Sequence, residues 1–153
     1  MTKIRRFEDL ICWQKARVLV NTIHRLTHRD EFSRDFRLRN QILDAAGSVM
    51  HNIAEGGDAG TDPEFIRFLK MARRSASEVQ SEVYLALDRK YITDTELKQA
   101  YDQADEAKRL INGLIAYLRQ GGRNNEKRIS KEQGDDAPKM KKAPTVSPTT
   151  IGL

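Results

Sequence analysis

Three basic residues recur on one face of the segment between residues 64 and 88. Placed at 100° per residue on a helix, Arg67, Lys70 and Arg74 fall within about 60° of one another and opposite an apolar stripe, so they must point outward. Guanidinium groups stay charged and offer several donors, which suits them to phosphate oxygens. The pattern predicts a basic ridge that contacts a nucleic-acid backbone without reading its sequence. Because Glu78 continues the same face, a solvated helix face with no ligand remains the alternative.

Other arginines extend this basic surface. Arg73 flanks the ridge, and two further pairs of arginines precede or begin helical segments elsewhere in the chain. The candidate nucleic-acid-binding residues are therefore Arg5, Arg6, Arg37, Arg39, Arg67, Lys70, Arg73 and Arg74. If copies of the chain close into a ring, the ridge is repeated around it, and individually weak contacts add through multivalency.

The histidines offer two weaker kinds of site. His24 and His28 are four residues apart and can supply two ligands to one metal, but no third ligand accompanies them, so a surface pair is the favoured interpretation. Arg17 lies one heptad before His24, which loosely resembles the arginine and histidine pair of a helical ribonuclease superfamily. That superfamily normally has a polar residue directly after the arginine, where this chain has Val18.

No other motif indicates catalysis. His51 and Glu55 are spaced for an acid and base pair, yet a modest interaction between helix neighbours is the simpler interpretation. Carboxylates are scattered along the sequence, which contains neither a glycine-rich phosphate loop after a strand nor a serine in a nucleophile turn. We predict a protein with no catalytic residue, no metal site and no cofactor.

Composition bounds the class of protein. A chain of 153 residues has room for one domain with a real core. The single Cys12 cannot form an internal disulfide, and no apolar run approaches the ~20 residues of a membrane span, so we expect a soluble cytoplasmic protein. The 27 Lys and Arg against 22 Asp and Glu give a net charge of +5, which favours polyanionic partners. More than half of this excess lies after Gln120.

Four segments with apolar residues three and four apart predict four helices. The first covers residues 7–27, and its predicted buried face consists of Trp13, Ala16, Val20 and Ile23. The second carries Leu38, Ile42, Ala45, Val49 and Ile53, and it ends at Gly56-Gly57, where glycine can adopt the left-handed conformation that closes a helix.

The third and fourth helices have marked beginnings. Thr61 and Thr93 are each followed three residues later by Glu, the pattern of a capping box. The third helix then carries Phe65, Leu69, Ala72, Ala76, Val79, Val83 and Leu87. The fourth carries Leu97, Tyr101, Ala104, Ile111, Ile115 and Leu118, and Gly121-Gly122 ends it.

These elements predict an all-α protein. Short connections require neighbouring helices to run antiparallel, so residues 1–120 form an up-down-up-down four-helix bundle. Residues 121–153 contain almost no large apolar side chains and many Lys, Pro, Ser and Thr, so we expect a disordered, flexible basic tail there.

A second set of apolar residues lies away from the predicted core stripes. Leu110, Leu114 and Tyr117 fall on a flank of the fourth helix, and Ile11 and Val18 lie opposite the inward face of the first. Such rows mark an association surface when they are exposed, so we predict a homo-oligomer. The alternative is that they widen the contact between neighbouring helices.

Two segments carry a resemblance to a known family. They are the set Phe7, Asp9, Leu10, Trp13, Gln14 and the run Asn52-Ile53-Ala54-Glu55-Gly56, supported by residues 64–69. Over residues 7–118 the chain resembles the four-helix-bundle family of proteins encoded in 23S ribosomal RNA intervening sequences. It differs from that pattern at Met50 and His51, where the family often has proline and a small residue.

The resemblance implies an antiparallel bundle that assembles into a pentameric ring. A related branch of the family is the accessory subunit of diversity-generating retroelements, which binds a reverse transcriptase and structured RNA. The leading hypothesis is therefore a non-enzymatic, self-associating bundle that binds the backbone of RNA or DNA. The resemblance implies that the partner is structured RNA. The alternative is a protein-interaction scaffold that serves as the accessory subunit of a reverse transcriptase.

Overall fold

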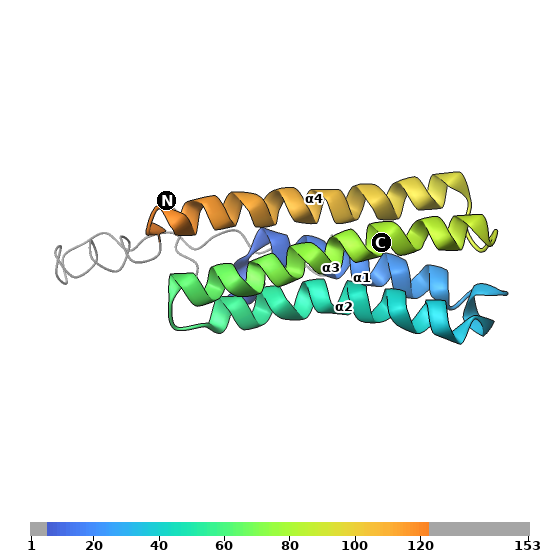
Figure 1. Cartoon of the computed structure of the whole chain (residues 1–153), viewed down its shortest axis with the longest axis horizontal. Helices are drawn as coiled ribbons and strands as arrows, with labels where there is room; N and C mark the ends of the chain where they lie inside the picture. The colour runs from blue at the N-terminus through green and yellow to red at the C-terminus, as the bar shows by residue number, and fades with distance from the viewer. Residues whose placement is uncertain (1–5, 123–153) are drawn as a thin grey trace, which may run out of the picture.

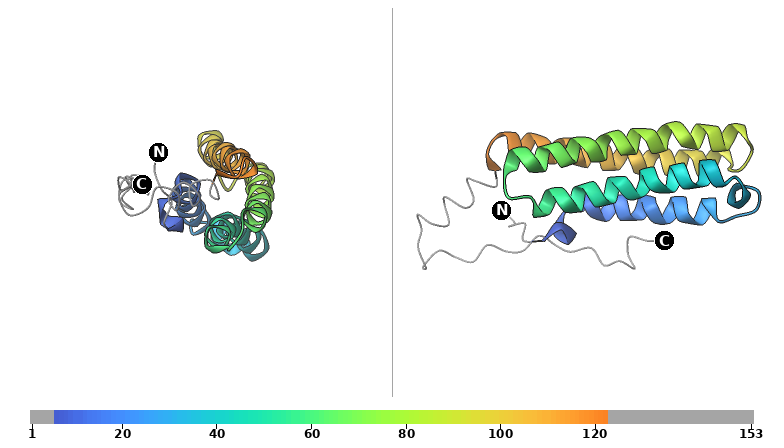
Figure 2. Two further views of the ribbon diagram at one scale, coloured as in Figure 1. Left: turned by 90° about the vertical axis from the view of Figure 1, so that its left-hand side faces the viewer. Right: turned by 60° about the horizontal axis from the view of Figure 1, so that its bottom comes forward.

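The structure, a computed structural model, describes residues 6–122 and confirms the predicted antiparallel four-helix bundle (Figure 1). In chain order its elements are the 3-10 helix η1 (Phe7–Asp9), α1 (Ile11–Thr27), the 3-10 helix η2 (Phe32–Arg34), α2 (Phe36–Asp58), α3 (Asp62–Asp88) and α4 (Asp94–Arg119). The end-on view in Figure 2 shows α3 between α2 and α4, while α1 contacts both α2 and α4. The candidate Arg5 and the predicted tail beyond Gly122 lie outside the described residues.

Side-chain caps fix where three of the helices begin. The hydroxyl of Thr61 accepts from the backbone N–H of Glu64 at 3.3 Å, and Thr93 and Glu96 make both bonds of a capping box. The predicted beginnings of the third and fourth helices are therefore confirmed. Asp35 caps α2 by accepting from the backbone N–H of Leu38, at 3.2 Å.

The predicted left-handed glycine end of the second helix is wrong. α2 continues through both glycines to Asp58, and the following Ala59 is extended. Gly56 is buried, and a Cβ placed on it would lie 2.7 Å from Cδ2 of Phe65 and 2.9 Å from Cβ of Phe68. The glycine therefore lets α2 approach α3 closely. The predicted glycine end of α4 is confirmed, since Gly121 has φ 71°.

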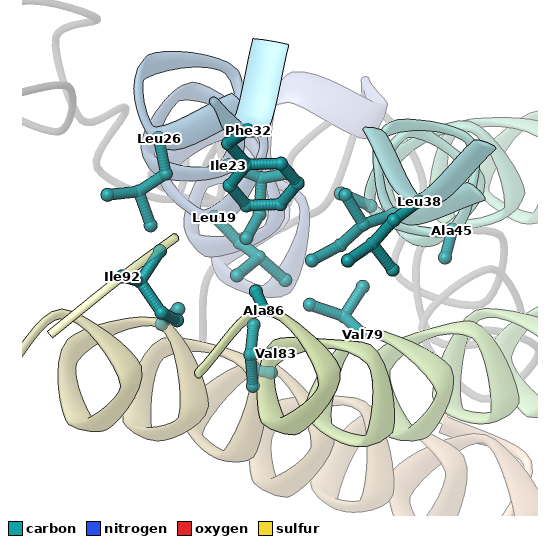
Figure 3. Close-up of a cluster of buried hydrophobic side chains, with 14 residues drawn as sticks. Leu19, Ile23, Leu26, Phe32, Leu38, Ala45, Val79, Val83, Ala86 and Ile92 are labelled. Atoms are coloured by element: carbon teal, nitrogen blue, oxygen red, sulfur yellow. The ribbon is translucent and has the colours of Figure 1, made fainter. Parts of the chain in front are cut away.

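The core forms two hydrophobic clusters along the bundle axis. Figure 3 shows the cluster nearer η2, in which Leu19 and Ile23 of α1 point toward side chains of α3, with Phe32 of η2 above them and Ile92 to the lower left. The second cluster surrounds Phe65 and Ile111 near the other end. The stripes predicted for the second and third helices supply most of their buried side chains.

The inward face of the first helix differs from the prediction. Trp13 and Val20 are only half-buried, whereas the buried apolar positions are Cys12, Ala16, Leu19, Ile23 and Leu26. The helix also begins later than predicted, because Leu10 is extended (ψ 121°) and separates η1 from α1. Compared with the prediction, α1 is therefore rotated about its own axis, so that Leu19 and Leu26 face the core. Among the described residues, no helix is long and apolar enough to cross a bilayer.

Candidate nucleic-acid interface

The predicted basic ridge lies on α3 and faces outward. Arg67 and Arg74 are exposed and Lys70 is partly exposed. Arg67 is compensated, because its Nη2 lies 2.8 Å from Oε1 of Glu64, and its guanidinium also stacks over the ring of Phe68 at 4.6 Å. Within residues 6–122, Lys70 and Arg74 have no acidic partner. Their charges therefore remain available to an anion from outside the described chain.

Arg73 turns toward α4 rather than along the ridge. Its Nη1 donates to Oδ1 of Asn112 at 2.7 Å. The amide is neutral, so this bond orients the guanidinium without cancelling its charge. Arg73 thereby widens the cationic surface from α3 toward α4.

Arg37 and Arg39 do not join this surface. α2 begins beside the end of α3, as the ion pair between Asp35 and Arg89 at 2.9 Å shows, so Arg37 and Arg39 lie at the opposite end of the bundle from the ridge. Along α3, the 15 residues from Arg74 to Arg89 span about 22 Å. Arg37 and Arg39 therefore lie apart from the basic ridge, and their binding of nucleic acid stays a prediction.

The two arginines at that end have different surroundings. Arg39 donates to the backbone oxygen of Ser33 at 2.8 Å and stacks over the ring of Phe36 at 4.8 Å. Arg37 is exposed and lines a shallow pocket of ≈ 510 Å³ together with Asp35, Leu38, Gln41, Leu85 and Arg89. Arg6 lies before η1, where it forms an ion pair with Glu8.

An acidic cluster that the sequence did not predict follows the ridge along α3. Glu82 is only 7% exposed, and burial, followed by the charges of Glu78 and Asp44, raises its pKa to about 7. Its Oε2 is buried and accepts no hydrogen bond from the described residues. Only the spacing of Glu78 and Glu82 was visible in the sequence. The burial of Glu82 depends on how α2 packs against α3.

Polar contacts hold α3 to both of its neighbours. Ser75 donates to Oγ of Ser48 at 2.9 Å across the α2–α3 contact. On the other side, Nζ of Lys108 donates to Oε1 of Gln80 at 3.0 Å, and Gln80 donates to the backbone oxygen of Tyr101. These bonds fix the height of α3 between α2 and α4, and so the height of the basic and acidic groups that it carries.

The other candidate groups form no catalytic arrangement in the described part of the chain. The rings of His24 and His28 stack with centroids 4.0 Å apart, and both are exposed. Arg17 lies over the ring of Trp13, 6.0 Å from its centroid. No group of three or more His, Cys, Asp or Glu side chains in residues 6–122 could hold a metal ion. Burial raises the pKa of the Cys12 thiol to about 12, so the thiol is protonated and unreactive.

The apolar residues predicted to lie on an association surface differ in exposure. Ile11 is 48% exposed. Leu110, Leu114 and Tyr117 are half-buried and pack against the core cluster around Ile111. The flank of α4 therefore also widens the contact between helices, as the alternative interpretation holds.

Comparison with known proteins gives the family. A family model described as 23S rRNA-intervening sequence protein matches residues 8–113. A crystal structure of a protein of unknown function from the S23 ribosomal protein family of Bacteroides thetaiotaomicron matches with a TM-score of 0.64 and 23% identity, over 71% of this chain and 98% of that chain. At that identity the likeness supports the bundle fold alone. None of the curated proteins compared with the chain matches it. As its motifs predicted, the chain belongs to the 23S rRNA-intervening sequence protein family.

Proposed function

We propose that this protein is a non-enzymatic binder of nucleic-acid backbones and that Lys70 and Arg74 of α3 make the principal phosphate contacts. The observation that carries the proposal is that both cations point outward and have no acidic partner among residues 6–122. Arg73 adds a third charge beside them, held by Asn112. Arg67 contributes less, because Glu64 already pairs with it.

The chemistry of this surface fits a backbone rather than a base sequence. Lysine and arginine contact phosphates of any nucleotide, and their binding free energy comes largely from the release of counterions. The net charge of +5 favours the same class of partner. Because the family description concerns ribosomal RNA, we propose structured RNA as the natural ligand.

Self-association is part of the proposal. The exposed Ile11 supports an apolar contact between copies, and a ring of five copies is the assembly that the sequence resemblance implies. Repetition of the α3 ridge around such a ring would let weak phosphate contacts act together. We place the protein in the cytoplasm, where a lone thiol such as Cys12 stays reduced.

The test compares two charge-reversed double variants. K70E/R74E reverses the unpaired cations of α3, and R25E/R119E makes the same change in net charge on exposed residues of α1 and α4. Fluorescence anisotropy with a labelled hairpin RNA should show at least a tenfold weaker affinity for K70E/R74E at 50 mM NaCl. The control should lose much less, and wild-type binding should weaken steeply with salt. Equal losses in the two variants, or binding indifferent to salt, would remove the proposed interface.

A second candidate function is the protein-interaction scaffold, including the accessory subunit of a reverse transcriptase. The observation that favours it is the exposure of large apolar side chains where α2 begins and α3 ends, with Phe36 63% and Leu85 43% exposed. If this surface is the functional one, F36A/L85A abolishes capture of the reverse transcriptase and leaves RNA affinity unchanged. K70E/R74E has the opposite pattern if the nucleic-acid proposal holds.

A further inference from the structure

The outward face of α3 changes sign halfway along the helix. Lys70 and Arg74 are one helical turn apart, and one turn further on the same side of the helix carries the exposed Glu78, followed by Glu82, which is buried on a flank of the helix. Asp44 of α2 joins this acidic half, because its charge acts on Glu82. The centres of the basic and acidic halves are about eight residues apart, or about 12 Å along the helix axis.

The acidic half lacks a compensating cation. Glu78 and Asp44 are exposed, Glu82 is nine-tenths buried, and none of the three pairs with a basic side chain among residues 6–122. Crowded carboxylates without a counter-charge are unfavourable, and a cation brought from outside relieves the repulsion. The basic half has the complementary deficit, since Lys70 and Arg74 lack an anion.

The two halves match one another when a second copy is turned end for end. A two-fold axis between the copies, perpendicular to α3 at the level of Ala76, places Arg74 of one copy level with Glu78 of the other, and Lys70 level with Glu82, next to which Asp44 lies. Every ion pair then occurs twice, as in any isologous contact. Two features favour close approach. The exposed side chain of Ser77 near the axis is small, and Met71 and Leu85 add apolar surface on either side, being 36% and 43% exposed.

We propose that a second copy of this chain docks antiparallel on the outward face of α3, with Lys70 and Arg74 of each copy facing Asp44 and Glu78 of the other. A metal ion is a poorer occupant, because no group of three ligands in the described chain could hold one. The pairing covers the cations assigned to nucleic acid. RNA and the second copy therefore compete for α3; this consequence rests on the proposed function, whereas the pairing itself does not.

The test is the solution mass of the full chain without nucleic acid, measured by sedimentation equilibrium at 50 and 500 mM NaCl. Wild type at low salt should have twice the mass of K70E/R74E, and high salt should bring wild type to the lower value. The quadruple swap D44K/K70E/R74E/E78R restores complementarity, so its mass should return to that of wild type. The control R25E/R119E should keep the wild-type mass.

A second measurement uses wild-type protein, so it tests the pairing even if a variant fails to fold. A carbodiimide that joins a lysine directly to a carboxylate should link Lys70 of one wild-type copy to Asp44 or Glu78 of another, as mass spectrometry of mixed heavy and light protein would show. An unchanged mass in K70E/R74E, a swap that stays at the lower mass, or no such link between copies would overturn the pairing. A doubled mass without RNA binding would overturn only the proposed function. RNA binding without a doubled mass would overturn only the pairing.

Discussion

Arg29 and Glu96 join the loop after α1 to the first turn of α4 through a two-pronged ion pair. Nη1 of Arg29 lies 2.5 Å from Oε2 of Glu96, and Nη2 lies 2.9 Å from Oε1. The same Glu96 accepts from the backbone N–H of Thr93 at 3.0 Å, which completes the capping box. One carboxylate therefore both begins α4 and ties it to the neighbouring α1.

The first prediction concerns acid stability. The hydrogen bond from Arg29 lowers the pKa of Glu96 to about 2, so the stabilisation is complete above the unfolded pKa of about 4.5 and is lost as pH falls toward 2. Arg29→Met should lower the free energy of unfolding by about 1 kcal/mol at pH 7, a modest value because the pair is partly exposed. Urea unfolding should show the difference from wild type shrinking as pH falls from 4.5 to 2. A difference that stays constant across this range would contradict the assignment, and Arg25→Met is the matched control.

The second prediction concerns Glu82, whose titration makes stability depend on pH in the opposite direction. The pKa of Glu82 is raised to about 7, so the folded state holds its proton more tightly than the unfolded state, and stability falls as pH rises from 4.5 through 7. Glu82→Gln keeps the shape without the charge. It should raise the free energy of unfolding by about 1–3 kcal/mol at pH 8 and change it little at pH 4. The measurement is urea unfolding at 500 mM NaCl, where paired copies should be apart. An equal gain at both pH values would exclude titration of Glu82 as the cause.

The third prediction uses two glycines in helices. Gly56→Ala should destabilise the protein by about 1–3 kcal/mol, because the new Cβ would meet the buried ring of Phe65 at 2.7 Å. A Cβ on Gly113 of α4 would point into open space, with no atom within 4 Å beyond its own helical backbone, so Gly113→Ala should instead stabilise by about 0.5–1 kcal/mol. Thermal unfolding should move the two Tm values in opposite directions. A gain in Tm for Gly56→Ala would show that α2 and α3 need no such close contact.

Local patterns predicted the helices because each signal is contained in one short segment. Thr61 and Thr93 mark their helices through bonds to residues three positions away, and the stripe of α3 is fixed by spacing alone. The role of Gly56 was not accessible in this way, since it depends on Phe65 in another helix. The stripe of α1 was assigned wrongly because apolar residues occupy both of its sides.

The same distinction between signals within one helix and contacts between helices applies to the candidate site. That Lys70 and Arg74 point outward follows from their place opposite the core stripe. The separation of Arg37 and Arg39 from the ridge follows from the antiparallel order of α2 and α3. The burial of Glu82, in contrast, requires knowing which flank of α3 meets α2, and no spacing within α3 reveals it.

The last prediction separates competition between copies from a general effect of charge. Glu78→Arg extends the basic ridge by one turn and also removes an acidic group that a second copy needs. It should therefore raise the affinity for a hairpin RNA at 50 mM NaCl by more than Asp102→Arg, which makes the same change in charge on an exposed residue of α4. The slope of log affinity against log salt should steepen by about one unit for Glu78→Arg, because one more phosphate is neutralised. Sedimentation of the same samples without RNA should show the lower mass for Glu78→Arg alone. If both variants gain equally and keep the wild-type mass, net charge explains the binding, and the face of α3 holds no second copy.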